Sequence, residues 1–171
     1  YSVAPGIHAS LELPAATALF EDGRLRLGIG TLAPAAVRAA AARTLGARGG
    51  MLIVDEAFAD ALAGASVLPL LRADDPVVVL RSFGKFYGLA GVRLGFVGGA
   101  QPEVTRIAAL LGDWPVSATA LAYGTAAYRD VAWAERIRVR LVAEAGDLDA
   151  LLAGCGWAAR GDCPLFRLVD G

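Results

Sequence analysis

Three polar side chains with different chemistry lie close together in one short segment, at Ser82, Lys85 and Arg93. The amine of Lys85 can attack a carbonyl carbon. The hydroxyl of Ser82 can donate a hydrogen bond, and the planar guanidinium of Arg93 can bind an anion through two N–H groups. Three glycines in the segment let the backbone bend and approach a ligand closely: Gly84, Gly88 and Gly91. The segment therefore predicts a site for an anionic ligand beside a nucleophilic amine.

A carboxylate, Asp55, directly follows the apolar run 51–54, and Ser82 closely follows a second apolar run at 77–80. Short continuous apolar runs of this kind are typical of buried strands. Open α/β sheets bind their ligands beyond the carboxyl ends of their strands. The sequence therefore predicts that the segment around Lys85 lies at the ligand-binding edge of a sheet, and that Asp55 stands at the end of a preceding strand.

Lys85 is the single lysine of the chain, which also contains fifteen arginines. A preference for arginine can follow from nucleotide composition alone, so most of the arginines need no functional explanation. One lysine retained in this background is a hint that the amine itself is required.

The segment 81–95 resembles the lysine motif of the class I/II aminotransferases, a family of fold-type I enzymes that use pyridoxal 5′-phosphate (PLP). The family motif is Ser-x-x-Lys, followed eight positions later by Arg, and Ser82, Lys85 and Arg93 match it position by position. The resemblance implies that Lys85 holds the cofactor as a Schiff base while Ser82 and Arg93 bind its phosphate. It also implies that Asp55 pairs with the pyridine nitrogen and keeps the ring cationic, so that the ring accepts electrons when a bond to Cα breaks.

Within the family, the chain resembles the L-threonine-O-3-phosphate decarboxylases of cobalamin biosynthesis, through residues 54–60, 80–91 and 113–117. Phe58 and the segment 114–117 favour this branch over the histidinol-phosphate aminotransferases. The implied reaction releases carbon dioxide and gives (R)-1-amino-2-propanol O-2-phosphate, with Lys85 as the general acid that returns a proton to Cα. An aminotransferase would use the same lysine and aspartate, so the motif itself does not separate the two. Trp114 and Ser117 are candidate substrate-side residues.

The chain departs from the family pattern at several places. Phe58 stands where the family often has a tyrosine that hydrogen-bonds the ring hydroxyl, so that contact must come from elsewhere. The chain contains no asparagine, although family members carry Asn-Pro-x-Asn-Pro-x-Gly before the aspartate. A glycine-rich phosphate cradle and a ring-stacking aromatic are not found in residues 1–30, and the arginine that grips the substrate carboxylate would lie beyond Gly171. We therefore expect that segments of the native polypeptide are missing from this sequence, with an internal seam near 25–31.

The apolar runs also predict the elements that position these residues. We expect strands at 51–54, 77–80 and 94–97, and strands of a new unit from Trp157 onward and at 165–169. Helical patterns cover 34–48, 103–111, 118–128 and 131–152. Alternation of apolar strands with helices indicates an α/β fold with a mostly parallel sheet covered by helices. The resemblance divides the chain into an unassigned segment (1–30), the core of a PLP-binding large domain (31–128), and a connecting helix with the start of a small domain (129–171).

Composition excludes several other classes of protein. Of the 171 residues 56% are hydrophobic and 19% charged, which is typical of a globular chain. A net charge of −1 argues against general binding to nucleic acid or to an anionic membrane, and the sequence contains no apolar run long enough to span one. His8, Cys155 and Cys163 form no metal-ligand or disulfide pattern, so we expect no metal site. No secretory signal is expected at the start, and we expect a cytoplasmic protein that binds a small phosphorylated amino acid; the family implies a homodimer.

Two alternatives from other classes remain open at this level. A degenerate PLP-type domain without catalysis would explain the missing asparagine and arginine. A nucleotide-binding domain is the weaker alternative: 51–56 resembles a Walker B strand, but Gly84-Lys85 is followed by Phe86 and lacks the earlier glycine of a phosphate-binding loop, where Val79 stands.

Overall fold

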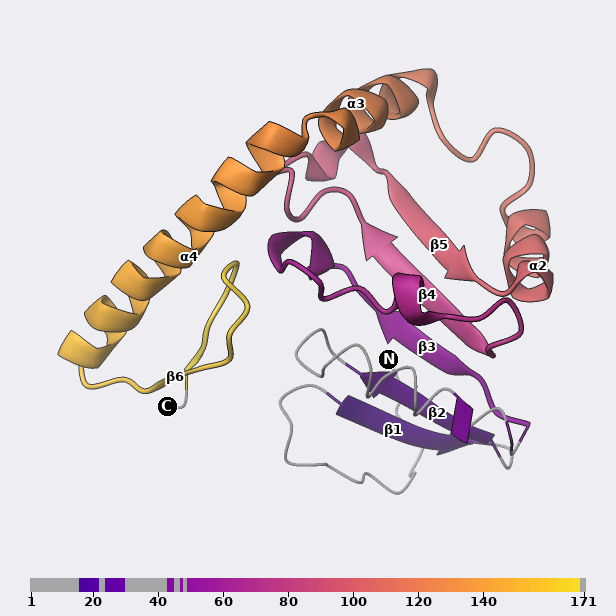
Figure 1. Cartoon of the computed structure of the whole chain (residues 1–171), viewed down its shortest axis with the longest axis horizontal. Helices are drawn as coiled ribbons and strands as arrows, with labels where there is room; N and C mark the ends of the chain where they lie inside the picture. The colour runs from indigo at the N-terminus through magenta and orange to yellow at the C-terminus, as the bar shows by residue number, and fades with distance from the viewer. Residues whose placement is uncertain (1–15, 22–23, 30–42, 45–46, 48, 170–171) are drawn as a thin grey trace.

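The computed structural model describes residues 16–21, 24–29, 43–44, 47 and 49–169. Five strands form one sheet in the order β1-β2-β3-β4-β5 (Figure 1). Their bounds are Ala16–Glu21, Arg24–Ile29, Leu52–Asp55, Val77–Ser82 and Gly95–Gly99. The two central pairings, β2 with β3 and β3 with β4, are parallel, whereas β1 with β2 and β4 with β5 are antiparallel. The expected parallel sheet is thus present at the centre, and its described part is mixed because both outer pairings are antiparallel.

Strands β3 and β4 alternate between two faces of the sheet. Leu52 and Val54 of β3 are completely buried, whereas Ile53 and Asp55 are exposed. In the register of the two strands, Leu52 lies opposite Val77 and Asp55 lies opposite Leu80. Residues directly opposite each other share a face and successive residues alternate, so one face is buried and the other is more open.

The buried face is covered by the segment that connects β3 to β4. It contains two single-turn 3-10 helices, Ala59–Ala61 and Leu68–Leu70, and no α-helix. Val67 in this segment is completely buried. The side chain of Leu68 packs over Gly98 of β5, where a Cβ would come within 2.8 Å of Leu68 Cδ2. The connection therefore covers the sheet without the regular helix that an alternating α/β pattern would place there.

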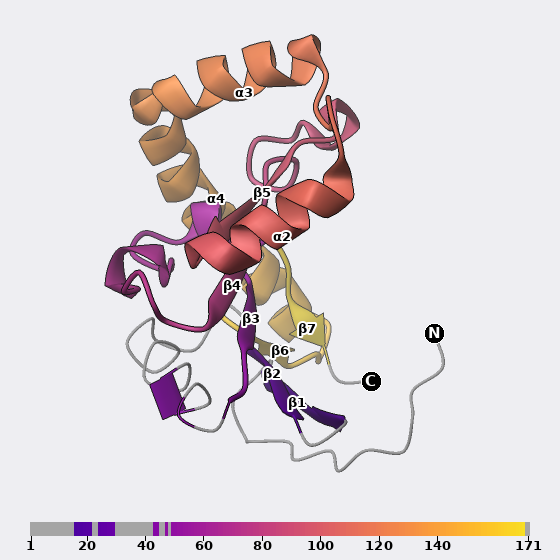
Figure 2. The same ribbon diagram turned by 90° about the vertical axis from the view of Figure 1, so that its right-hand side faces the viewer.

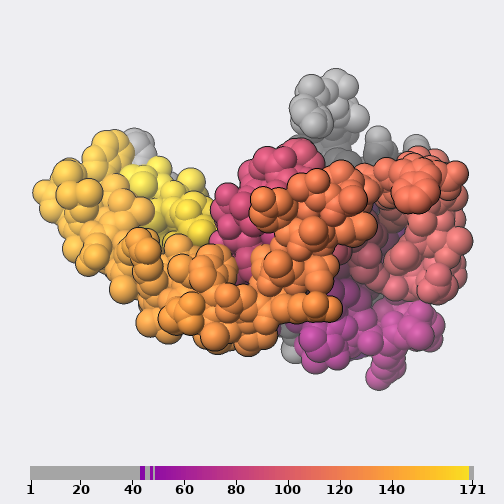
Figure 3. All heavy atoms as spheres, turned by 90° about the horizontal axis from the view of Figure 1, so that it is seen from above, coloured from indigo at the N-terminus to yellow at the C-terminus, as the bar shows by residue number. Residues whose placement is uncertain are grey.

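Three helices follow the sheet: α2 (Gln101–Leu111), α3 (Ala118–Arg129) and α4 (Val131–Gly154). Figures 1 and 2 show α4 running beside the sheet, with the short strands β6 (Ala159–Arg160) and β7 (Leu168–Val169) near its C-terminal end. Asp130 begins α4 as its N-cap by accepting a hydrogen bond from the backbone N–H of Trp133 at 2.9 Å. In the space-filling view, the end of α4 and the β6–β7 residues project as a lobe from the rest of the molecule (Figure 3).

A small hydrophobic cluster joins α4 to the main body. Its buried members are Ala61, Phe86 and Ala134, and Trp133 and Leu165 are among the half-buried side chains around them. The cluster connects α4 to the turn after β4 and to the segment before β7. It fixes the position of the helix relative to the residues that follow Ser82.

The strands and helices expected in the second half of the chain are confirmed with shifts of one to two residues at most of their ends. The hairpin β1–β2 was not predicted, because Gly23, Gly28 and nearby prolines interrupt any periodicity. Most of the helix expected at 34–48 lies outside the described residues, and Arg43 and Thr44 within it are helical. The suspected seam at 25–31 and the domain boundary after residue 128 stay predictions. None of the helices within the described ranges combines the length and apolar character needed to cross a membrane.

Candidate active site

The turn that carries Lys85 is held in place by the aromatic residues on either side of the lysine. Phe83 is completely buried and stacks on Tyr87, with 4.9 Å between ring centroids. Phe86 is also buried and meets Trp133 of α4 edge to face at 5.7 Å. Because the rings at 83 and 86 point inward, Lys85 between them is left exposed. The buried rings of Phe83 and Phe86 thus fix the turn and leave the amine of Lys85 accessible.

The same turn packs closely on the 3-10 helix Ala90–Val92. A Cβ at Gly84 would lie 2.5 Å from the Cα of Ala90, so only glycine fits there without displacing backbone. The 3-10 helix ends at Arg93, which has a left-handed backbone (φ 58°). Arg93 Nη1 donates to the carbonyl of Ala90 at 3.3 Å, which turns the guanidinium back toward the segment that carries Lys85.

Ser82, Lys85 and Arg93 line one cavity of about 380 Å³ at the carboxyl end of β4. Its other lining residues are Arg81, Gly84, Ala90, Leu94 and Gly95. The lining combines the hydroxyl of Ser82, the ammonium of Lys85 and the guanidinium of Arg93, and it contains no acidic side chain. A cavity with this set of donors fits a phosphate-bearing ligand that also reacts with an amine.

Asp55 lies at the end of β3 on the same sheet face as Ser82, because Asp55 is opposite Leu80 and Ser82 is two residues further along β4. Its Oδ1 accepts a hydrogen bond from the backbone N–H of Ala57 at 2.9 Å. Asp55 does not itself line the cavity. Phe58 lies near Lys85: the Nζ of Lys85 is 5.9 Å from the centroid of the Phe58 ring. The structure therefore brings four of the predicted residues to one end of the sheet and places the carboxylate beside them on the neighbouring strand.

The two candidate substrate-side residues lie elsewhere. Trp114 is 94% exposed, with a left-handed backbone (φ 59°), and does not line the cavity. The hydroxyl of Ser117 caps α3 by accepting a hydrogen bond from Ala120 N at 3.1 Å. Helix capping accounts for Ser117 without a ligand, and a substrate contact for either residue stays a prediction.

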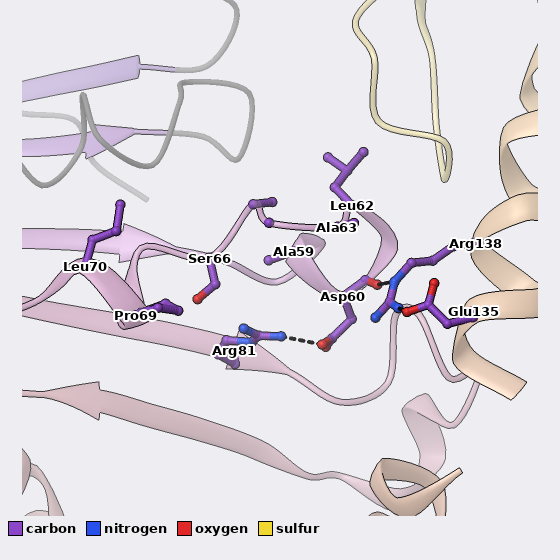
Figure 4. A pocket seen from close by; sticks show the side chains of 12 residues that line it. Ala59, Asp60, Leu62, Ala63, Ser66, Pro69, Leu70, Arg81, Glu135 and Arg138 are labelled. Carbon is purple, nitrogen blue, oxygen red and sulfur yellow. Dashed lines mark hydrogen bonds and ion pairs between the residues drawn. The ribbon is translucent and has the colours of Figure 1, made fainter. Parts of the chain in front are cut away.

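Behind the sheet, on the face opposite Asp55 and Ser82, lies a buried ionic network that was not predicted. Figure 4 shows Arg81 directed at Asp60 and Arg138 of α4 approaching the same residue. The guanidinium of Arg81 forms ion pairs with Glu56 (3.4 Å) and with Asp60. Arg138 Nε donates to the backbone carbonyl of Asp60 at 2.8 Å. Asp60, Arg81 and Arg138 border a separate pocket of about 500 Å³.

The charge of Asp60 acts on two tyrosines nearby. Its Oδ2 is buried and lacks a hydrogen-bond partner among the described residues. Partial burial raises the pKa of Tyr128, which is 38% exposed, to about 12, and the negative charge of Asp60 adds to the rise. The pKa of Tyr87 is raised by the same two causes in the same order. Both phenols therefore stay neutral across the physiological range.

Glu56 could have been recognised from the strand pattern. Adjacent residues of a strand point to opposite faces, so if Asp55 faces the ligand edge, Glu56 must point into the covered face and needs a partner there. In the same way, Arg81 must point into the covered face if Ser82 faces the ligand edge. Asp60 gave no comparable indication, because it follows the strand in an irregular segment.

The fold and the site together define the class of protein. The model of the family "Aminotransferase class I and II" matches residues 29–167. The chain therefore belongs to the class I/II aminotransferase family, whose members are PLP enzymes of fold type I, and the resemblance of the lysine motif is confirmed at that level. The family assignment removes the nucleotide-binding alternative.

Individual relatives fall into two groups within the family. The chain is 42% identical over 139 residues to a threonine-phosphate decarboxylase from Sinorhizobium sp., covering 81% of this chain and 41% of the relative. It is 34% identical over 110 residues to histidinol-phosphate aminotransferase 1 of Bradyrhizobium diazoefficiens, covering 63% of this chain and 31% of the relative. The chain thus spans about two-fifths or less of the length of these curated relatives.

A solved structure shows the same fold. The histidinol-phosphate aminotransferase of Sinorhizobium meliloti, crystallised with PLP, superposes with a TM-score of 0.73 at 22% identity, over 86% of this chain and 42% of that structure. At this identity the similarity establishes the fold alone. The fold-type I architecture is confirmed.

Proposed function

We propose that this chain is part of a PLP-dependent enzyme that decarboxylates L-threonine O-3-phosphate to (R)-1-amino-2-propanol O-2-phosphate. The observation that carries the proposal is the shared cavity of Ser82, Lys85 and Arg93, with Asp55 on the same face of the sheet. The higher identity to the threonine-phosphate decarboxylase than to the histidinol-phosphate aminotransferase supports the choice of reaction.

The residues of the cavity fit the separate parts of the cofactor. The Ser82 hydroxyl and the Arg93 guanidinium would bind the phosphate, because a fork of N–H donors matches phosphate oxygens. The Lys85 amine would bind the aldehyde carbon. The Asp55 carboxylate would hold a proton on the pyridine nitrogen, and the Phe58 ring, which lies beside Lys85, would border the cofactor without donating a hydrogen bond.

When bound, PLP supplies an electron sink for the bond that breaks at Cα. This chain's residues then act as follows. Asp55 would keep the ring nitrogen protonated, Ser82 and Arg93 would hold the phosphate, and the amine of Lys85 would deliver a proton to Cα as a general acid. The exposed position of Lys85 leaves its amine free to serve as both the attachment point and the acid.

Lys85 provides a direct test of the cofactor assignment. Reduction of the PLP-loaded protein with borohydride should fix the cofactor on Lys85. Trypsin would then leave the fragment 82–93 uncut at position 85, since Arg81 and Arg93 are its flanking cleavage sites. Lys85→Ala should give no labelled fragment and should lower kcat by at least about 10³-fold, because it removes both attachment and general acid. A labelled fragment elsewhere, or none in the unmodified protein, contradicts the assignment.

The reaction itself needs a second measurement. Release of carbon dioxide from threonine phosphate without any keto acid is the expected result. Amino transfer that requires 2-oxoglutarate or glutamate would instead establish the runner-up, a histidinol-phosphate or related aminotransferase. Absence of a PLP absorbance band after reconstitution would favour a non-catalytic domain of this fold. A cytoplasmic homodimer with its site at the subunit interface is the assembly we propose from the family.

A further inference from the structure

We propose that Arg81, held between Glu56 and Asp60 on the covered face of the sheet, is a positioning residue that sets the spacing of Asp55 and Ser82 on the opposite face. The inference rests on the proposed function, because it assigns a role toward the same cofactor site. Arg81 also borders the cavity, but its guanidinium is paired with Glu56 and Asp60 behind the sheet, so we assign its effect on the site to the two strands that it joins.

Successive residues of β3 and β4 point to opposite faces of the sheet. Asp55 and Ser82 belong to the ligand face, and the next residue after Asp55 and the residue before Ser82 belong to the covered face. Those two residues, Glu56 and Arg81, form an ion pair with 3.4 Å between Oε2 and Nη1. The ion pair therefore joins the carboxyl ends of β3 and β4 directly behind the pair of residues that must face the cofactor.

Glu56 is fixed in place behind the sheet. It is completely buried. One carboxylate oxygen accepts from the backbone N–H of Val67 at 2.6 Å, and the other accepts from the hydroxyl of Ser66 at 2.7 Å. Its backbone N–H donates to the carbonyl of Leu80 at 2.8 Å, which extends the pairing of β3 with β4 past Asp55. A carboxylate held at both oxygens cannot follow Arg81 if that side chain moves, so it acts as an anchor.

A second carboxylate, that of Asp60, also holds Arg81. Asp60 pairs with the other terminal nitrogen of Arg81, and its backbone carbonyl accepts from Arg138 of α4 at 2.8 Å. Arg81 is thus gripped from two sides by groups on the β3–β4 connection, and that connection is tied to α4 (Figure 4). The planar fork of arginine can hold two carboxylates at fixed angles, which a single ammonium cannot do.

Buried ion pairs add little net stability when both partners are present, but loss of one partner leaves a buried charge without compensation. The network is therefore better explained as a device that fixes geometry than as a source of stability. Active-site groups must be held to within about 0.5 Å of the productive position. An ion pair between the ends of β3 and β4 fixes the distance between Asp55 and Ser82, the proposed cofactor contact of each strand.

The test compares Arg81→Gln with Arg167→Gln in the complete protein. Arg167 is a matched control: it is also largely buried and pairs with a carboxylate, Asp149, at 2.5 and 3.0 Å, but it lies in the segment before β7. For each variant, the PLP dissociation constant, the circular dichroism induced in the bound cofactor and the denaturant midpoint are measured. Induced circular dichroism reports how the cofactor is oriented, which a general loss of stability does not change.

We expect Arg81→Gln to raise the PLP dissociation constant by about 10–100-fold, as for a displacement of reacting groups on the order of 1 Å, and to reduce the induced signal. Arg167→Gln should change the PLP dissociation constant and the induced circular dichroism by less than about twofold, at a similar loss of stability. Equal PLP binding by the Arg81 variant and the unmodified protein, or equal losses in both variants, overturns the inference. If Arg81→Gln does not fold, Glu56→Gln decides by the same measurements, because it keeps the size of the anchor and removes its charge. Unmodified protein that fails to bind PLP would instead refute the proposed function.

Discussion

Lys85 illustrates how single residues are presented at this site. Its neighbours Phe83 and Phe86 are buried and the lysine is exposed, so the turn is fixed while the amine stays accessible. The role that we propose for Lys85, to bind a cofactor and then release it, needs this combination of a rigid backbone and an accessible side chain. The side chains of Glu56 and Arg81, in contrast, are held behind the sheet by an ion pair between them and by a hydrogen bond from Ser66 to Glu56.

Tyr128 provides a prediction for pH dependence at the same scale. Its pKa in the folded protein is about 12, above the value of 10.0 for a free tyrosine. Between these two values the unfolded chain ionises while the folded protein stays neutral. The contribution of Tyr128 to stability is therefore fully present below pH 10 and is lost as pH rises toward 12.

We expect the free energy of unfolding of the unmodified protein to fall more steeply above pH 10 than that of Tyr128→Phe. Denaturant titrations at several pH values between 8 and 12 would measure the difference. Parallel curves for the two proteins would contradict the assigned cause, namely burial near Asp60.

At the scale of elements, the turn 83–93 is shaped by one close backbone approach. Gly84 lies against Ala90, whereas Gly91, in the 3-10 helix itself, has no atom within 4 Å of the position a Cβ would take. Neither glycine requires a left-handed backbone. Replacement of Gly84 therefore tests the close packing against Ala90, and replacement of Gly91 shows the effect of losing a glycine from the same turn without that packing.

Gly84→Ala should lower the free energy of unfolding by about 1–3 kcal/mol, because the added methyl group must displace the backbone at Ala90. Gly91→Ala should change it by less than about 0.5 kcal/mol. Urea denaturation of both variants provides the comparison. A loss from Gly91→Ala as large as that from Gly84→Ala would mean that the close approach is not what fixes the turn.

At the scale of the whole molecule, α4 is joined to the sheet at few points. Phe86 packs against it, and the guanidinium of Arg138 lies over the ring of Phe86, 5.4 Å from its centroid. Much of the remaining surface of α4 is apolar and exposed, as at Val139, Val142 and Leu151. The cluster around Phe86 is therefore the main hydrophobic link between the helix and the lysine turn.

Phe86→Ala should cost about 3–5 kcal/mol, since this ring is 4% exposed and its removal leaves a cavity between α4 and the turn. Phe96→Ala is the control: its ring is 43% exposed, so its removal should cost less than half as much. Chemical denaturation followed by far-ultraviolet circular dichroism measures both. Equal costs would show that the cluster does not hold the helix.

The sequence alone determined the parts of this protein that depend on local pattern. Continuous apolar runs predicted β3, β4 and β5, helical periodicity predicted α2, α3 and α4, and the spacing of Ser82, Lys85 and Arg93 predicted their meeting at a strand end. These features follow from neighbours in the chain, because strand alternation and turn geometry act over a few residues.

Only the tertiary structure decided which partners the remaining charges have. Strand alternation sends Asp55 and Glu56 to opposite faces of the sheet, but only the pairing of β3 with β4 places Arg81 beside the buried Glu56. Asp60 and Arg138 are 78 positions apart and meet because α4 packs on the turn after β4. The energy of a buried charge depends on what the fold places beside it, and no local pattern contains that information.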